Sequence, residues 1–430
     1  MMHVFIRRTF INAARPITIK EVHHSLTRLV DPHHICVNDA NMSQVREIMM
    51  KNDELDQSEL EPKSVQDSYT EAVIPLALDS SLREEYRNFV GSVRTARILE
   101  DLDTMAVNIA YSHNIRDHFI NGIRFSPLAI VTAAVKKIAM SGPLELHKNV
   151  MLCGNVYRVG KSSCHVRMTM KQEVSDSNWN DTLDAEFVLV AKNPATNRAI
   201  AMNPLNKDKS SNPDETNGST CKITNKFLTS QKYTISPNLE ESKLIHDLYL
   251  SRTKVLDGVS ISNTILKSAQ ICEPQFRNIY GKIFGGFLMR SSYELAWTNT
   301  RIFAKSFPKI VIIGDISFER SVEIGSILSM SSVISYTKGN YIVNRVTAEV
   351  IEPDTKETYL TNTFYYIFET SQPSPAILPT QYSALVNHIA VRRFYAAFDY
   401  NENRKRRKYE ERINVAECDK FAIVQPVKFT

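Results

Sequence analysis

Two stretches decide the interpretation of this chain: ARILEDLDTMAVNIAYS at residues 96–112 and GGFLMRSSYELAWTNTRIF at residues 285–303. Each predicts an amphipathic helix, because apolar or small residues recur along one stripe at helical spacing. In the first stretch the stripe consists of Ile98, Leu99, Leu102, Met105, Ala106, Ile109 and Ala110. The same offsets in the second stretch select Leu288, Met289, Ser292, Leu295, Ala296, Asn299 and Thr300. The match holds for about two turns and then weakens, so we interpret the helices as two copies of one template.

Strand-like segments follow both helices and extend the repeat. They lie at 150–174 and 184–194 after the first helix, and at 310–337, 341–353 and 361–370 after the second. All are rich in β-branched and aromatic residues, and the turn residues TKGN (337–340) and EPD (352–354) suit antiparallel hairpins. A long helix before a run of antiparallel strands, found twice, predicts an α+β protein with each helix packed on a sheet.

A polar segment rich in Lys, Asp, Ser, Asn and Gly separates the two halves. After it, Ser236 as N-cap and Pro237 at the first helical position predict a connecting helix. We expect these boundaries: a leader at 1–30, an N-terminal extension at 31–67, a first domain at 68–205, a flexible linker at 206–235, the connecting helix with a second domain at 236–375, and a C-terminal extension at 376–430.

Composition excludes several classes of protein. The 430 residues are 43% hydrophobic and 23% charged, as in globular proteins, and no apolar run reaches the roughly 18 residues of a spanning helix. A net charge of +5 is too small to indicate a nucleic-acid partner. The six cysteines form no C-x-x-C pair, so we expect free thiols, no metal site and no cofactor.

The first 30 residues are basic and nearly free of acids. They contain Glu21 as the single acid against Arg7, Arg8, Arg15, Lys20 and Arg28. Such Arg-containing, acid-poor leaders are typical of mitochondrial transit peptides, whereas a secretory signal would need a longer apolar core. A frayed basic terminus is the alternative.

Several motifs resemble the mitochondrial acyl-coenzyme A thioesterase 9 family: RNIYGKIFGGFLMRSSYELAW at 277–297, SFERSVEIGS at 317–326, and RILEDLD at 97–103 with SPLAIVTA at 126–133. The likeness runs from about Ser68 to about Pro379. It implies an α+β fold of two tandem hotdog units, each an antiparallel sheet wrapped around a long central helix. It also implies hydrolysis of fatty acyl-CoA to free fatty acid and coenzyme A in the mitochondrial matrix, by a trimer of double-hotdog chains.

This chain departs from related hotdog thioesterases in one loop and one strand segment. They often carry Asn or His in the loop where this chain has Lys282 and Phe284, and a Pro in the segment that holds Ser321. The first departure leaves open which side chain positions the attacking water.

Water can cleave a thioester if a base activates it and donors stabilise the charge that develops on the carbonyl oxygen. Gly285 and Gly286 stand before the second helix, where bare backbone and the helix dipole suit that oxygen. We therefore nominate the Gly286 amide as oxyanion donor and Gly285 as a substrate contact. A tight turn is the alternative reading of the glycine pair.

The general base is expected on the first helix. Asp103 falls at the margin of the apolar stripe, where partial desolvation would raise its pKa. The matching position of the second helix is Tyr293, while Thr95 and Ala96 replace the glycines in the first half. If the helices pack antiparallel, as the family's do, Asp103 faces Gly286 in one composite site, and the symmetry-related site is inactive.

Other residues compete for these roles. Glu294 is the rival base, although its helical angle lies opposite the centre of the stripe, and Asp103 could merely pair with Arg97. Asn278 could orient the water or form a turn. For the phosphates of coenzyme A we nominate Lys282 and Arg290, ahead of the basic run at 404–408.

Two other functions remain open on the same fold. An acyl-thioester hydratase or dehydratase would need a histidine with an acid in the active helix, and residues 96–112 and 286–303 contain none. His113 follows the first helix and is expected to be structural. A non-catalytic acyl-CoA-binding protein is the second alternative.

Overall fold

The computed structural model describes residues 17–28, 39–206, 236–251 and 258–400, apart from positions 117, 121–122, 176–177, 279–280, 354, 356, 380–381 and 383. The chain divides into two compact units. The larger unit joins Met1–Asn217 to Asp257–Leu378 and contains all the strands that the structure describes. The smaller unit joins Gly218–Leu256 to Pro379–Thr430.

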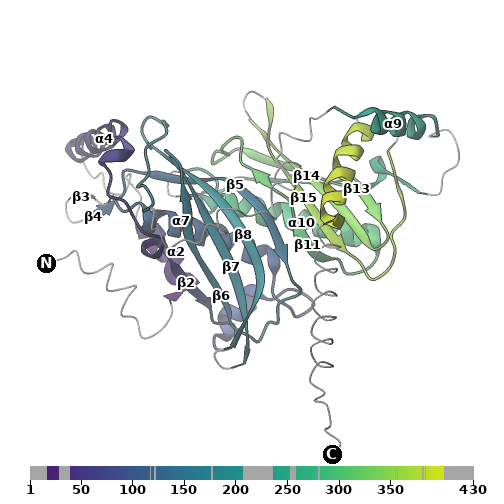
Figure 1. The fold of residues 1–430 in the computed structure, drawn as a ribbon, viewed down its shortest axis with the longest axis horizontal. Helices are drawn as coiled ribbons and strands as arrows, with labels where there is room; N and C mark the ends of the chain where they lie inside the picture. Colours follow the sequence, from purple (N-terminus) through teal and green to yellow (C-terminus); the bar gives the residue numbers. More distant parts are fainter. Residues whose placement is uncertain are drawn as a thin grey trace, which may run out of the picture. The chain divides into compact units, whose positions relative to one another are not determined.

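A large, almost wholly antiparallel sheet forms the larger unit (Figure 1). The first half of the chain supplies β2 (Thr70–Ile74), β5 (Ala129–Met140), β6 (Val150–Val159), β7 (Ser163–Ser175) and β8 (Asn178–Lys192). The second half supplies β10 (Leu266–Ile271), β11 (Lys309–Ile313), β12 (Ile316–Ser317), β13 (Ile327–Lys338), β14 (Tyr341–Ile351) and β15 (Thr358–Glu369). The expected hairpin turns at 337–340 and 352–354 connect β13, β14 and β15.

The two halves repeat one topology. Their strands lie in the orders β2-β6-β7-β8-β5 and β10-β13-β14-β15-β11, so corresponding strands occupy corresponding places. The halves meet where β5 pairs antiparallel with β11, with Ile312 opposite Ala139 and Ile313 opposite Ile138. Pairing of equivalent strands in opposite directions is the arrangement expected of two copies related by an approximate twofold axis.

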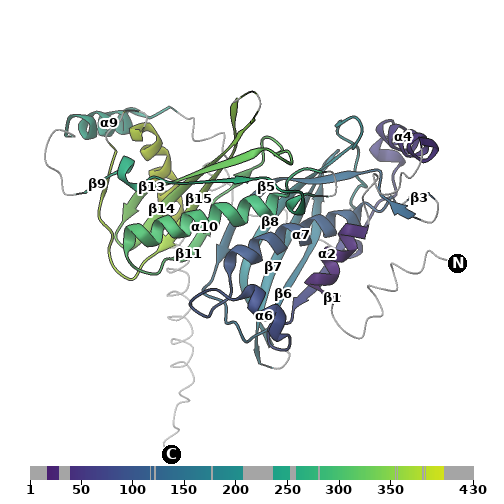
Figure 2. The same ribbon diagram turned by 180° about the vertical axis from the view of Figure 1, so that it is seen from behind.

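Each half carries one long helix, α7 (Thr95–His113) or α10 (Gly285–Ala304), on the same face of the sheet (Figure 2). The predicted stripe of α7 is fully buried against the sheet, from Ile98 at 0% exposure to Ala110 at 0%. In α10 the stripe becomes polar at Asn299 and Thr300, and both are nevertheless buried. They belong to a hydrogen-bonded group in which Asn299 donates to Ser332, and Asn344 donates to Thr300.

Residues 17–28, which we expected to belong to the leader, form part of the first half instead. β1 (Ile17–Thr18) pairs with β2, and α2 (Ile19–Arg28) packs on α7. Ile19, Val22 and Leu26 are buried, because they form the apolar side of a short amphipathic helix. Residues 1–16 lie outside the described residues, so only the end of the expected leader is affected.

The connecting helix also differs from the expectation. It is α9 (Leu239–Ser251), and Asn238 caps it by accepting from the Glu241 N–H, so Ser236 is not the cap. It belongs to the smaller unit, where Ile245 packs with Leu385 and Ile389 of the helical segment 384–400, rather than to the second half. The expected linker beyond residue 206 and the basic run 404–408 lie outside the described residues.

Shorter elements complete the described chain. They are α4 (Asp39–Asp53), η1 (Gln57–Glu59), α5 (Val65–Ser68), α6 (Ser80–Tyr86), β3 (His118–Ile120), β4 (Ile123–Phe125), β9 (Val259–Ser260), η3 (Ile261–Thr264), η4 (Pro274–Phe276) and β16 (Ile377–Leu378). No helix in the described ranges combines the length and apolarity needed to cross a membrane.

Candidate active site

Asp103 lies in the middle of α7, and none of its surface is exposed. Its Oδ1 accepts a hydrogen bond from the Thr132 hydroxyl at 2.6 Å, and its Oδ2 accepts one from the Gly286 backbone N–H at 2.6 Å. The carboxyl group therefore connects α7 to strand β5 and to the first turn of α10. The structure thus brings together the acid of the first half and the glycine pair of the second.

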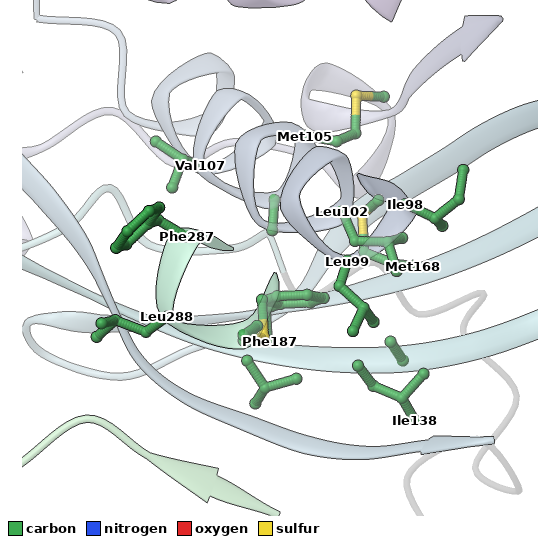
Figure 3. Close-up of a cluster of buried hydrophobic side chains, with 14 of the residues drawn as sticks. Ile98, Leu99, Leu102, Met105, Val107, Ile138, Met168, Phe187, Phe287 and Leu288 are labelled. Atoms are coloured by element: carbon green, nitrogen blue, oxygen red, sulfur yellow. The ribbon is translucent and has the colours of Figure 1, made fainter. Parts of the chain in front are cut away.

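The surroundings of Asp103 are mostly apolar. Figure 3 shows Leu99 and Leu102 of α7 in one cluster with Phe287 and Leu288 from the start of α10 and Phe187 from β8. The pKa of Asp103 is raised to about 6, chiefly because burial disfavours the ionised form, and the neighbouring charge of Glu100 contributes to the rise. The hydrogen bonds from Thr132 and Gly286 act in the opposite direction. A carboxyl group with this pKa is largely ionised at neutral pH and more basic than an ordinary aspartate.

The glycine pair lets α10 approach α7 closely. A Cβ atom on Gly285 would lie 3.0 Å from Oδ2 of Asp103 and 3.2 Å from the Phe318 ring. A Cβ atom on Gly286 would lie 3.0 Å from Cα of Glu100 and 3.1 Å from its carbonyl oxygen. Any side chain at either position would therefore push the helices apart or displace the carboxylate.

The first turn of α10 does not present its amides as the sequence suggested. The Gly286 N–H, expected to be open to a substrate oxygen, already donates to Asp103. The Gly285 N–H has no acceptor among the described residues, and it stands at the positive end of the same helix. One free donor thus lies beside the carboxylate, and a second could be released if Asp103 moved.

Lys282 and Arg290, expected to bind phosphates, are both paired with acids. The Lys282 ammonium contacts the carboxylate of Glu323. Arg290 lies 3.5 Å from Glu100 and over the rings of Phe276 and Phe287. Neither cation is therefore held free for a ligand in this structure.

Glu294, the rival base, lies at the opposite end of the helix pair. Its carboxylate contacts Arg94, the residue that precedes α7, and both side chains are 41% exposed. Beside it, buried Tyr293 is hydrogen-bonded to the side chain of Thr95. Tyr293 and Thr95 occupy the positions in the repeat that correspond to Asp103 and Gly285, and the structure places them together. Glu294 therefore lies beside this symmetry-related counterpart and not in the candidate site itself.

Asn278 forms a turn that occurs in both halves. Its side chain accepts from the Lys282 N–H at 3.1 Å, and Gly281 has a φ of 71°. In the first half, Asn88 accepts from the Ser92 N–H at 2.9 Å, and Gly91 has a φ of 82°. The first half keeps the same turn although Thr95 and Ala96 replace the glycine pair there, so the turn formed by Asn278 does not depend on the glycines.

Sequence reasoning missed two residues at the site. Thr132 lies within the SPLAIVTA motif, so a hydroxyl in a motif strand was the available signal. Glu100 lies outside the predicted apolar stripe of α7, yet it is only 8% exposed because α10 covers it. Its burial depends on the crossing of two helices and leaves no local signal. His113, for which a packed or an exposed side chain was open, is buried, and its Nε2 contacts the carbonyl oxygen of Asn203.

No family model matches the chain. It is 36% identical over 386 residues to acyl-coenzyme A thioesterase 10, mitochondrial, of Mus musculus, covering 86% of each chain. It is 38% identical over 343 residues to acyl-coenzyme A thioesterase 9, mitochondrial, of Homo sapiens, covering 76% of each chain. A buried acid beside backbone amides at a helix N-terminus offers a base and oxyanion donors, the groups that hydrolysis of an acyl compound needs. The chain belongs to the family of mitochondrial acyl-coenzyme A thioesterases 9 and 10.

Two solved structures resemble parts of the chain at low sequence identity. An acyl-CoA hydrolase from Staphylococcus aureus, in complex with butyryl coenzyme A, matches 37% of this chain and 98% of its own, with 18% identity and a TM-score of 0.30. The 12:0-ACP thioesterase from Umbellularia californica matches 71% and 95%, with 12% identity and a TM-score of 0.44.

Proposed function

We propose that this chain is a mitochondrial acyl-CoA thioesterase that hydrolyses fatty acyl-CoA to free fatty acid and coenzyme A. The observation that carries the mechanism is the 2.6 Å contact between Asp103 of α7 and the first turn of α10. Family membership supports the reaction, and the site geometry supports the assignment of roles.

In the proposed reaction, Asp103 acts as general base. Its carboxylate takes a proton from water while the water oxygen attacks the thioester carbonyl carbon. The carbonyl oxygen becomes negative and accepts hydrogen bonds from the Gly285 and Gly286 amides, the latter after Asp103 has turned towards the water. Collapse of the tetrahedral intermediate breaks the carbon–sulfur bond, and the sulfur of coenzyme A leaves as a thiol after receiving the proton from Asp103.

The two halves support a tandem double-hotdog architecture, in which each sheet wraps around its own helix. Only one composite site is then functional, because Tyr293 and Thr95 occupy the counterpart positions of Asp103 and Gly285. We further propose a location in the mitochondrial matrix, a transit peptide that ends before Ile17, and a trimer of double-hotdog chains.

A hydratase or dehydratase receives no support from this site. That chemistry would need a histidine beside the acid, and His113 lies about 15 Å further along α7 at 1.5 Å per residue. Its Nε2 is bonded to Asn203, at the end of the helix remote from Gly286.

The test compares Asp103→Asn with Glu294→Gln in an assay of free thiol release over a series of acyl chain lengths. We expect Asp103→Asn to lower kcat by about 10²- to 10⁴-fold, the usual contribution of a general base, with acyl-CoA binding retained. Glu294→Gln should retain the wild-type rate. An active Asp103→Asn together with an inactive Glu294→Gln would transfer the role to Glu294, and no thiol release by the wild type would remove the thioesterase proposal.

A further inference from the structure

Glu100 and Arg290 occupy equivalent positions in the two halves and contact each other. Each is the sixth residue of its helix, and Oε2 of Glu100 lies 3.5 Å from the Arg290 guanidinium. On either side of this contact, Asp103 meets Gly286 and Arg94 meets Glu294, so the helices run antiparallel. The Glu100–Arg290 contact therefore marks the point where α7 and α10 cross.

Glu100 is held from two sides at this crossing. The Arg97 guanidinium, one turn earlier on α7, donates to its Oε2 at 2.6 Å, and Arg290 approaches the same oxygen from α10. The backbone of Glu100 lies directly beneath Gly286, within 3.0 Å of where a Cβ would stand. Phe276 and Phe287, stacked at 4.2 Å, hold Arg290 in place.

We propose that Glu100, clamped between Arg97 and Arg290, is a positioning residue that holds the Gly286 amide against Asp103 and places a charge beside the base. This inference rests on the proposed role of Asp103. It reassigns Arg290 from a phosphate ligand to a partner of Glu100.

Few other charges face Asp103. Among the described residues, Glu100 is the charged group that acts on Asp103, and Arg97 and Arg290 are the cations that contact Glu100. The oxygens of Asp101 bond to His23 of α2 and to Tyr86, and one of them lies 3.9 Å from Arg97. The remaining contacts come from the uncharged Thr132 and Phe318. Glu100 with Arg97 and Arg290, which we call the Glu100 clamp, is thus the main source of charge that could shift the pKa of Asp103.

Removal of the acid of the clamp and removal of either arginine should shift the pKa of Asp103 in opposite directions. Removal of the negative Glu100 leaves two cations nearby, which favour ionised Asp103, so the pKa of the base should fall. Removal of Arg97 or Arg290 leaves Glu100 uncompensated, so the pKa of the base should rise. A role confined to packing would not shift the pKa in opposite directions.

The experiment measures kcat/KM against pH for the wild type, Glu100→Gln, Arg290→Gln and Arg97→Gln, since this profile reports ionisations of the free enzyme. We expect the acid limb to move down by about half a unit to one unit in Glu100→Gln and up by a similar amount in the arginine variants. Glu294→Gln and Arg94→Gln are matched controls, because this pair joins the same helices away from Asp103. Their acid limbs should stay at the wild-type position.

Three outcomes are separable. If Asp103→Asn is inactive but the acid limb is unchanged in all the clamp variants, the proposed function stands and the clamp does not. If Arg290→Gln raises KM alone, Arg290 is a substrate ligand and the clamp is again refuted. An active Asp103→Asn would instead overturn the proposed function. If Glu100→Gln fails to fold, Arg97→Gln and Arg290→Gln decide the question, because the acid limb of kcat/KM must move to higher pH in both.

Discussion

At the scale of single residues, Asp103 shows how burial and hydrogen bonding oppose each other. A buried carboxylate is costly, and two hydrogen bonds from Thr132 and Gly286 offset part of that cost. The net effect is a pKa raised to about 6 from the usual 3.8, so ionisation is less favourable than in an exposed aspartate. The carboxyl group that we propose as general base is therefore a source of instability at neutral pH.

We predict that Asp103→Asn stabilises the protein above pH 6. The folded-state pKa exceeds the unfolded one, so the native carboxyl group destabilises the fold increasingly as pH rises from about 4 through 6. A shift of two units corresponds to on the order of 3 kcal/mol at full ionisation. Thermal denaturation from pH 5 to 8 should show a Tm advantage of the variant that is largest at pH 8 and shrinks towards pH 5. An advantage that is independent of pH would contradict this explanation.

At the scale of elements, α2 lies within the expected leader but packs against the core. Its His23 contacts buried Asp101 at 3.1 Å, and Ser25 donates to Asn108 of α7. The basic composition of residues 1–30 predicts a leader but cannot locate its end. The apolar spacing of Ile19, Val22 and Leu26 was present in the sequence, and only the tertiary contact shows that it is used.

Two truncations test this placement. Removal of residues 1–16 should leave Tm unchanged, whereas removal of residues 1–30 should lower it strongly. The second truncation exposes the surface under Ile19, Val22 and Leu26, and each such side chain contributes about 1.5–3 kcal/mol when fully buried. Differential scanning calorimetry of both proteins checks the prediction. Equal Tm values would show that α2 is dispensable and restore residue 30 as an acceptable end of the leader.

The sequence predicted the long elements well and their assembly only in part. Both helices and most central strands carry strong periodic patterns, so α7, α10 and the strands from β13 to β15 lie where expected. Strand β5 was missed, although the pairing of the halves depends on it. The turn built by Asn88 and Gly91 was missed as well, because its likeness to Asn278 and Gly281 involves few residues. Contacts between the helices, such as that of Glu100, are not encoded by local spacing.

At the scale of the whole molecule, we expect one functional acyl-CoA site per chain. Duplicated topology alone would suggest two sites, but the second pair of positions holds Tyr293 and Thr95. The phenol ring of Tyr293 is 7% exposed and packs on Tyr366 and Phe368, so it fills the space rather than lining an opening.

Calorimetric titration of Asp103→Asn with acyl-CoA should therefore give one equivalent bound per chain. This variant is chosen because it is expected to bind substrate without consuming it. The double variant Asp103→Asn, Glu294→Gln should bind the same single equivalent, since Glu294 lies next to Tyr293 at the symmetry-related counterpart of the site. Two equivalents per chain would show that the counterpart still accepts substrate.

The pairing of Glu100 with Arg290 has an evolutionary consequence. In a homodimer, a residue at the crossing point faces its own copy, so an acid there would always oppose an acid. Duplication and fusion of the gene lift that restriction, because each copy can then mutate alone. Unlike charges at the crossing would have been inaccessible to an ancestor with two identical subunits. Under the proposed composite site, selection could thus adjust one pocket, to which both copies contribute, without a matching change at its counterpart.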